Sequence, residues 1–264
     1  MARLDQFRDE VNFRDLGGYR ASDGRAIKHG LIYRSGGLYR MDERERKEFE
    51  RLGVRAVMEL RTTGEIEQEP DPVFDGVRQV HYAGHEFGEG AEIDFSPEGM
   101  HRLGDGARDQ YDKLVGYYRT MAFDNEAYRN LFELLETGEV PVVFHCASGK
   151  DRTGVAAIII MLALGVPEET ILADYMLSNE YRAKKIAESY EEYADHIAAD
   201  PLAEKLTMLE NGVLLETAEM VLDSFIERYG SYEAYLEAEY GLAPARIEAL
   251  RDRYLEPAGE GAGA

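Results

Sequence analysis

The 264-residue sequence predicts an α/β fold, with a sheet flanked by helices and a helical C-terminal half. Two observations support this prediction. Short apolar, β-branched segments are mixed with amphipathic segments up to residue 145, and beyond Pro167 the pattern is almost entirely helical. Because no internal repeat or Pro- or Ser-rich linker divides the chain, we expect a single domain over residues 1–256 and a disordered tail over 257–264.

The first part of the chain predicts short strands and one capped helix. Residues 11–40 are expected to form short strands joined by glycine turns. Asp42 is suited to cap a helix that runs to about Leu52, with Gly53 as its end signal. Residues 54–60 have the apolar, β-branched character of a central strand.

The middle of the chain predicts a short acidic helix near Glu65, a strand over residues 77–83 and two amphipathic helices. The apolar stripes of these two helices lie in residues 111–118 and 128–135. Residues 84–107 contain six glycines and have no clear periodicity, so we expect a loop or lid there.

The C-terminal half is expected to contain several helices. One apolar face repeats at helical spacing over residues 214–225, and a last helix is expected to run to about Leu255.

The most informative segment is residues 145–154, His-Cys-Ala-Ser-Gly-Lys-Asp-Arg-Thr-Gly. It follows a short β-branched stretch at 140–144 and precedes ten unbroken apolar residues at 155–164, so it should connect a buried strand to a core helix. Backbone N–H groups in such a turn, together with the positive end of the helix dipole, favour a bound anion.

The residue types in this turn suit phosphoryl transfer. Cys146 is the only cysteine and lies six positions before Arg152. A helix N-terminus and nearby cations lower the pKa of a thiol, and the thiolate attacks phosphorus to form a cysteinyl-phosphate. The guanidinium of Arg152 has the fork geometry that matches two phosphate oxygens. Gly149 allows the backbone to curl around the anion, and the hydroxyl of Thr153 would stabilise the thiolate.

Residues 145–154 resemble the signature H-C-x-x-G-K-D-R-T-G of the bacterial cysteine-dependent tyrosine and dual-specificity phosphatases, including the secreted bacterial tyrosine and lipid phosphatases. The resemblance extends from about residue 10 to 255 and includes further segments at 12–19, 31–36, 60–65, 165–167, 173–179 and 229–231. It implies the cysteine-phosphatase fold, with a mainly parallel central sheet and a helical lid or insertion. The nucleophile loop would lie at the C-terminal end of a central strand.

The resemblance also suggests roles for the other loop residues. The predicted substrate-binding residues are Ala147, Ser148, Gly149, Lys150 and Thr153. Lys150 either adds a point charge for a second phosphate or faces solvent. His145 would hydrogen-bond within the loop and help to lower the pKa of the thiol, although a lone histidine at a strand end is more often a core residue.

Asp151 is the predicted general acid. The familiar tyrosine phosphatases carry this acid on a separate Trp-Pro-Asp loop, but the chain has no tryptophan, and nothing around Asp71-Pro72 indicates a hinged loop. Alternatively, Asp151 only balances the charges of Lys150 and Arg152. Glu59 stands where the family usually has Asp; it is the next candidate for the acid, or else a strand-end carboxylate paired with an arginine.

The composition limits the partners of the protein. The 52 acidic and 30 basic residues give a formal charge of −22, which argues against nucleic acid and against electrostatic docking on anionic membranes. Positive potential must therefore be local, from Arg152, Lys150 and either Arg34 or Arg14. No metal or organic cofactor is expected, because His81 and His85 lack further ligands at matching spacing.

The sequence predicts a cytoplasmic protein. A single cysteine fits a reducing compartment, and the first twenty residues contain no apolar signal region. The longest apolar run, ten residues, is too short to span a bilayer. Export by a route without a classical signal stays open.

These observations predict a phosphomonoester hydrolase that acts as a protein-tyrosine phosphatase through Cys146. Dual specificity and action on phosphoinositides remain open, as do the physiological substrate and the oligomeric state. Two alternatives belong to other classes: an inert phosphate-binding interaction protein, and a rhodanese-like sulfurtransferase, which also uses one loop cysteine. The intact Cys146, Asp151 and Arg152 count against the first, and the loop length and arginine position against the second.

Overall fold

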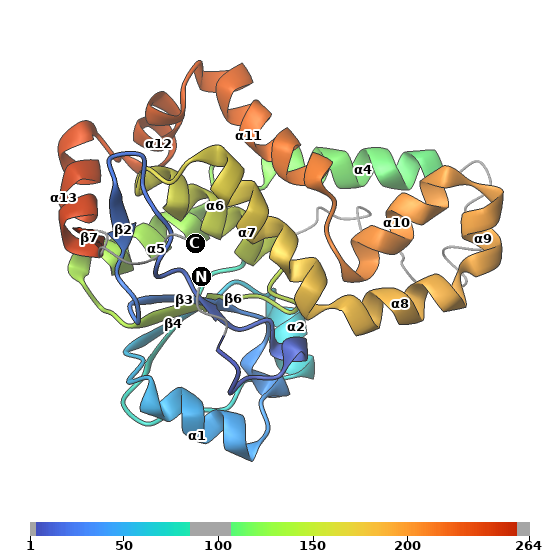
Figure 1. Cartoon of the computed structure of the whole chain (residues 1–264), viewed down its shortest axis with the longest axis horizontal. Helices are drawn as coiled ribbons and strands as arrows, with labels where there is room; N and C mark the ends of the chain where they lie inside the picture. Colours follow the sequence, from blue (N-terminus) through green and yellow to red (C-terminus); the bar gives the residue numbers. More distant parts are fainter. Residues whose placement is uncertain (1–3, 85–106, 258–264) are drawn as a thin grey trace.

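The computed structural model describes residues 4–84 and 107–257, and its centre is a five-stranded sheet (Figure 1). The strand order is β1-β3-β6-β4-β5, and all neighbours are parallel except the pair β1 and β3. The strands are β1 (Arg14–Asp15), β3 (Ile32–Ser35), β6 (Val142–His145), β4 (Ala56–Glu59) and β5 (Arg78–His81). The expected α/β fold with a mainly parallel sheet is confirmed.

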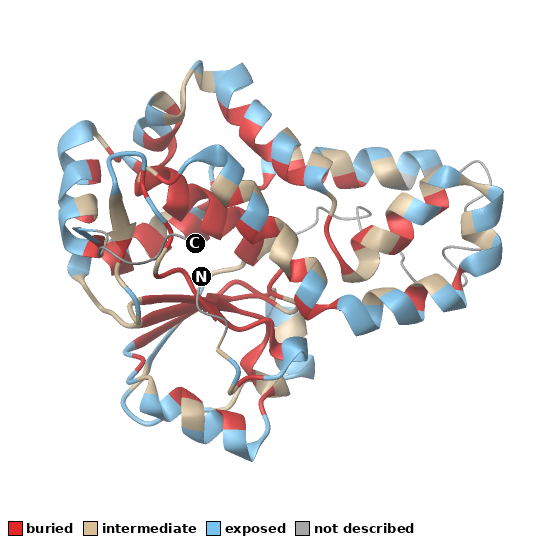
Figure 2. Ribbon diagram, in the orientation of Figure 1, coloured by how far each residue is buried: buried red, intermediate tan, exposed pale blue. Residues whose placement is uncertain are grey.

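Helices cover both faces of this sheet (Figures 1 and 2). Helix α1 (Glu43–Arg51) lies on one face. The other face carries α5 (Glu126–Thr137), α6 (Arg152–Ala163), α12 (Tyr232–Tyr240) and α13 (Pro244–Tyr254). Strand β6 is buried on both sides: Val143 packs in the core under α1, whereas Val142 and Phe144 pack in the core under α6. Such double burial explains why the strand is apolar without alternation.

Two helices begin with the capping interactions that their sequences predict. Asp42 accepts a hydrogen bond from the backbone N–H of Glu45, and the Glu45 carboxylate accepts one from the backbone of Asp42, so α1 begins with a capping box. Helix α2 (Thr63–Gln68) has the same arrangement between Thr62 and Glu65. The second box fixes the carboxylate of Glu65 beside the nucleophile loop.

The helices that follow α6 include an arm that extends away from the sheet (Figure 1). After α7 (Glu168–Tyr181), the arm consists of α8 (Ala183–Glu192), α9 (Ala194–Ala199) and α10 (Pro201–Asn211). Helix α10 packs against α4 (Ala107–Thr120), and the chain returns through α11 (Leu215–Tyr229). This helical arm is the insertion that the family resemblance implies.

The structure differs from the sequence predictions at the C-terminus. The last helix ends at Tyr254, and Leu255–Pro257 forms β7, which pairs antiparallel with β2 (Arg25–Ile27). Pro257, predicted to begin the disordered tail, is therefore part of a strand and lies opposite Arg25. Residues 258–264 lie outside the described part of the chain, as does almost all of the loop or lid expected at 84–107.

The N-terminal part contains two 3-10 turns besides the expected short strands: η1 (Asp9–Val11) and η2 (Leu38–Arg40). Among the residues that the structure describes, no helix combines the length and the apolar character needed to cross a lipid bilayer.

Candidate active site

The nucleophile loop connects β6 to α6 as predicted. Strand β6 ends at His145, Cys146 follows, and α6 begins at Arg152. Cys146 is 2% exposed. Gly149 has a φ of 71°, and a Cβ atom there would lie 2.6 Å from the backbone of Ser35 and Gly36, so the turn requires glycine. The loop thus packs closely on the end of β3.

The environment of Cys146 favours the thiolate. Burial raises the pKa of the thiol, but the positive charge of Arg152 and the nearby hydroxyl and backbone N–H of Thr153 lower it, and the net effect is a lowered pKa. Thr153 and Arg152 open α6, where the helix dipole also favours negative charge. Cys146 is therefore placed and activated as a nucleophile needs to be.

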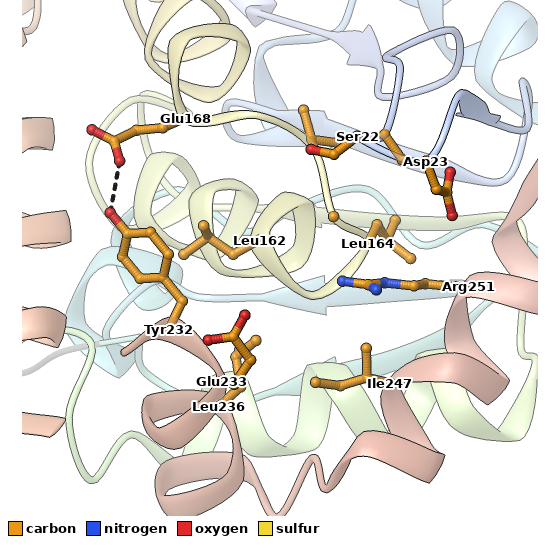
Figure 3. A pocket seen from close by; sticks show the side chains of 13 residues that line it. Ser22, Asp23, Leu162, Leu164, Glu168, Tyr232, Glu233, Leu236, Ile247 and Arg251 are labelled. Atoms are coloured by element: carbon orange, nitrogen blue, oxygen red, sulfur yellow. Dashed lines mark hydrogen bonds between the residues drawn. The ribbon is translucent and has the colours of Figure 1, made fainter. Parts of the chain in front are cut away.

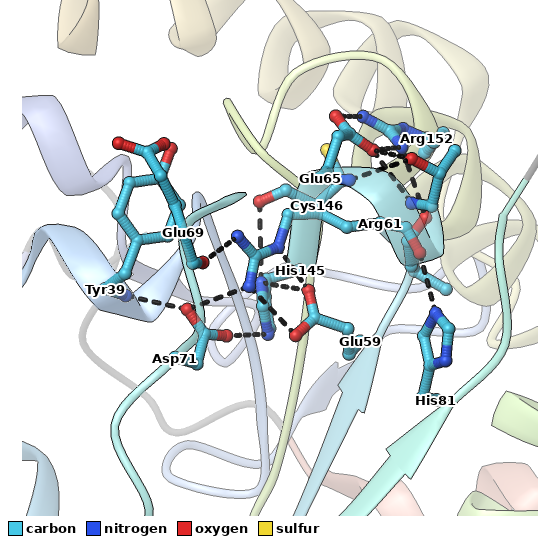
Figure 4. A network of polar contacts seen from close by, with 12 residues as sticks. Tyr39, Glu59, Arg61, Glu65, Glu69, Asp71, His81, His145, Cys146 and Arg152 are labelled. Carbon is cyan, nitrogen blue, oxygen red and sulfur yellow. Dashed lines mark hydrogen bonds and ion pairs between the residues drawn. The ribbon is translucent and has the colours of Figure 1, made fainter. Parts of the chain in front are cut away.

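Arg152 forms a two-pronged ion pair with Glu65 (Figure 4). Its Nη1 and Nη2 atoms donate to Oε2 and Oε1 of Glu65 at 2.6 and 2.8 Å. Burial raises the pKa of Glu65, but Arg152 lowers it more, to about 2. Among the described residues, Nε of Arg152 has no hydrogen-bond acceptor. The side edge of the guanidinium thus remains suited to phosphate, while Glu65 holds the other edge.

A buried charged network lies behind the loop (Figure 4). Glu59 ends β4 directly opposite His145 of β6, and its carboxylate accepts hydrogen bonds from Nε and Nη2 of Arg61. Arg61 Nη2 also lies 3.2 Å from Oδ1 of Asp71. The alternative prediction for Glu59, a strand-end carboxylate paired with an arginine, matches these contacts.

Asp71 is the site residue that sequence reasoning dismissed. Its Oδ2 lies 3.1 Å from Nε2 of His145, and its Oδ1 accepts a 2.7 Å hydrogen bond from the backbone of Tyr39. Burial raises the pKa of Asp71, but His145 and Arg61 lower it by more, so the net effect is a lowered pKa. Burial lowers the pKa of His145, but Asp71 raises it by more, so the net effect is a raised pKa. The contact with Asp71 thus favours the charged form of His145, which lies directly before Cys146.

Glu59, Asp71 and His145 bring ligand-type atoms within 4.8 Å of one another, the spacing of a metal site. The guanidinium of Arg61 contacts both carboxylates of this cluster. Because this cation already compensates the negative charge, we assign the cluster to the ion-pair network.

Asp151 and Lys150 lie at the mouth of the loop and contact the helices above it. Asp151 accepts a hydrogen bond from the hydroxyl of Tyr118 on α4, and its Oδ2 lies 2.9 Å from Nζ of Lys150. Lys150 is buried and also donates to the carbonyl of Leu209 on α10 at 2.6 Å. The lysine therefore does not face solvent: it ties the loop to the arm.

Arg14 and Arg34 are not surface cations near the substrate path. Both are fully buried and form ion pairs with Asp174 of α7, and Nη2 of Arg34 donates to the carbonyl of Gly149 at 2.9 Å. They support the loop from beneath. The expectation that Arg34 or Arg14 adds positive potential at the surface is therefore wrong: both side chains are buried and have a structural role.

A separate cavity of about 360 Å³ lies at the far end of α6 (Figure 3). Its wall includes Leu162 and Leu164 at the end of that helix, and Tyr232, which donates to Glu168 at 2.8 Å. Twelve residues of helix separate this end from Arg152, a distance of roughly 18 Å. The cavity is therefore not part of the site around Cys146.

The fold and the loop together define a cysteine-dependent phosphatase: a buried thiol with a lowered pKa follows a central parallel strand, and an arginine lies at the N-terminus of the next helix. A sequence model of the tyrosine phosphatase family matches residues 6–256, so the chain belongs to that family. The family and the enzyme class expected from residues 145–154 are thus confirmed.

Two relatives illustrate the similarity. The chain is 29% identical over 270 residues to the triple specificity protein phosphatase PtpB of Mycobacterium tuberculosis, an alignment that covers 91% of this chain and 95% of PtpB. It is 27% identical over 236 residues to a tyrosine-protein phosphatase of Nostoc commune, with 86% and 75% of the two chains covered.

Proposed function

We propose that this protein hydrolyses phosphotyrosine in proteins through a cysteinyl-phosphate on Cys146. The observation that carries the proposal is the position of the single cysteine: its buried thiol directly follows β6, in the loop that leads to Arg152 at the start of α6. The reaction has two steps: Sγ displaces the tyrosine oxygen from phosphorus, and water then displaces Sγ and releases inorganic phosphate.

Arg152 and the loop backbone stabilise the transferring phosphoryl group in this proposal. The loop from Ala147 to Thr153, which includes Ser148 and Gly149, offers backbone N–H groups at the helix N-terminus. Arg152 contributes its Nε edge, while Glu65 fixes its other edge. Electrostatic stabilisation by oriented donors supplies a large share of the catalysis of phosphoryl transfer.

We assign the general acid to Asp151. Its carboxyl lies on the loop itself, is partly exposed, and is oriented by Tyr118 and Lys150. Glu59 is largely buried and occupied by Arg61. Asp151 would give its proton to the tyrosine oxygen in the first step and take one from water in the second.

The test compares Asp151→Asn with Glu59→Gln on two substrates, with Cys146→Ser as the nucleophile control. Asp151→Asn should slow phosphotyrosine peptide hydrolysis by about 10²–10⁴-fold, because the leaving group then departs without protonation. It should spare kcat/KM for an aryl phosphate whose leaving group has a low pKa, because this ratio reports only the first step. Cys146→Ser should lose turnover of both substrates.

Two results would reject these assignments. Near-native turnover by Cys146→Ser would remove the cysteinyl-phosphate. If Glu59→Gln showed the leaving-group dependence while Asp151→Asn slowed both substrates equally, the proton donor would be Glu59.

A further inference from the structure

A second concave, cation-lined site lies beside the nucleophile loop. The cavity has a volume of about 530 Å³ and lies between η1, η2 and the junction of α7 and α8. We call it the basic pocket; its cations are Arg8, Arg40, Arg182, Lys184 and Lys185. Asp9, Glu10 and Glu180 also line it. A net positive cavity is unexpected in a chain with a formal charge of −22.

Three of the five cations are not neutralised. Glu45 pairs with Arg8 at 2.9 Å, and Glu188 pairs with Lys185 at 3.0 Å. Among the described residues, no carboxylate lies within ion-pair distance of Arg40, Arg182 or Lys184. The Nε atom of Arg40 is buried and has no hydrogen-bond partner in the described part of the chain. Such groups gain most from an anionic ligand.

The residues that flank η1 and η2, two elements that contribute to the wall of the basic pocket, contact the nucleophile loop. Asn12, which follows η1, donates from Nδ2 to the carbonyl of Ser148 at 3.1 Å, and the backbone N–H of Gly37, which precedes η2, donates to the carbonyl of Ala147 at 3.1 Å. Arg182 lines the basic pocket, and the charges of the nucleophile loop act on it. Burial and the charge of Arg40 lower its pKa, while the negative charges of Asp151 and Cys146 oppose that shift.

Neighbouring side chains fix the two arginines in place. Arg182 is buried and donates to the carbonyl and side chain of Asn211 at the end of the arm. The guanidinium of Arg40 lies 5.0 Å from the ring centre of Tyr39 and donates to its hydroxyl at 2.7 Å. Preorganised guanidinium groups bind carboxylate and phosphate with little loss of side-chain entropy.

Resting on the proposed function, we infer that the basic pocket binds a second anionic side chain of the phosphotyrosine peptide, a carboxylate or a second phosphate close in sequence to the phosphotyrosine. In an extended peptide, successive residues are about 3.3 Å apart, so a side chain near the phosphotyrosine reaches a site next to the loop. The formal charge of −22 makes an anionic membrane surface a less favourable source of the second anion.

The test measures kcat/KM for two phosphotyrosine peptides that differ only in flanking residues, neutral in one and glutamate or phosphoserine in the other. The wild type should prefer the acidic peptide, and the preference should fall about tenfold in Arg40→Gln and in Lys184→Gln, as expected when a charged hydrogen bond is lost. Because Lys184 is exposed, Lys184→Gln should fold normally, and it provides the test if Arg40→Gln does not fold. Arg55→Gln, the same change at an exposed site before β4, should keep the preference.

Equal kcat/KM for both peptides in the wild type would overturn the inference while leaving the proposed function intact. Failure of the wild type to hydrolyse either peptide would instead reject the proposed function. A soluble inositol bisphosphate serves as a third probe. If it inhibited the wild type more than Lys184→Gln while the peptides were not discriminated, the pocket would recognise a head group, and the peptide assignment would be wrong.

Discussion

The imidazole of His145 lies directly before the nucleophile, with a carboxylate near each of its nitrogen atoms. Asp71 is 3.1 Å from Nε2, and Glu59 is 3.8 Å from Nδ1. A cation held at this place stabilises the negative charge of the adjacent Cys146. We propose that a positive charge on His145 acts on Cys146 in this way and that Asp71 positions the imidazole ring.

The raised pKa of His145 and the lowered pKa of Asp71 define a pH window for this pair. A histidine whose pKa is raised by folding stabilises the folded protein fully below its unfolded pKa, about 6.5. This stabilisation is lost as the pH rises through the pKa of the folded state. An aspartate whose pKa is lowered by folding stabilises the folded protein above its unfolded pKa, about 3.9. This stabilisation is lost as the pH falls through the pKa of the folded state. Between these limits the ion pair is fully formed.

Asp71→Asn should therefore lower the pKa of His145 and raise that of Cys146. The rate of alkylation of Cys146 by iodoacetamide, measured against pH, should reach its plateau at higher pH than in the wild type. Glu67→Gln, an exposed change on α2, serves as the control and should leave the profile unchanged. An unaltered profile in Asp71→Asn would show that the histidine does not act on the thiol.

Sequence alone was sufficient to place Cys146 and Arg152 in one loop between a strand and a helix, because both lie in one ten-residue segment whose neighbours predict these elements. Asp71 and Glu65 could not be assigned to their partners in the same way. Asp71 follows α2 in an irregular segment, and its contact with His145 depends on how that segment folds back over the sheet. Glu65 was part of the family pattern, but nothing local to α2 pointed to Arg152.

Among the elements, parallel pairing of β4 with β6 creates the network behind the loop, since it places Glu59 opposite His145. The arm also contacts the loop, through residues of α10. Lys150 donates a hydrogen bond to the carbonyl of Leu209 on α10, and Arg182 donates one to the side chain of Asn211 on the same helix. The sequence predicted helices after Pro167, but an amphipathic pattern does not specify which neighbour a helix packs against. The link between arm and loop therefore required the structure.

Lys150→Met should loosen this link, because it removes the charged donor and keeps the apolar stem. Hydrogen–deuterium exchange of the backbone amides of α10 should become faster, with a smaller change in α6, which is buried in the core. Lys47→Met removes an exposed lysine that pairs with Glu43 on α1 and is the matched control. Unchanged exchange in α10 would mean that the other contacts of the arm hold it without Lys150.

At the scale of the whole molecule, the negative surface contrasts with a buried positive centre. Arg14 of β1 and Arg34 of β3 both contact Asp174 of α7, which joins the sheet edge, the nucleophile loop and the helical layer. Burial raises the pKa of Asp174, but the two arginines lower it, to about 2. Burial and the charge of Arg14 lower the pKa of Arg34 to about 10. One carboxylate thus compensates two buried cations.

Asp174→Asn should destabilise the fold by about 3–5 kcal/mol, because it leaves two buried guanidinium groups without a counter-charge. Urea unfolding at neutral pH measures this loss. Asp223→Asn, an exposed change on α11, should alter the free energy of unfolding by less than about 0.5 kcal/mol. A loss below about 1 kcal/mol in Asp174→Asn would contradict the role given to this carboxylate.

The covalent intermediate on Cys146 provides the most direct test of the mechanism. With an aryl phosphate of low leaving-group pKa, Asp151→Asn should form the intermediate readily and hydrolyse it slowly, because the second step still needs a base. Acid quenching within the first turnover, followed by mass spectrometry of the peptide that contains Cys146, should show one added phosphoryl group. Turnover in which Cys146 never carries phosphate, or in which another residue carries it, would contradict the mechanism.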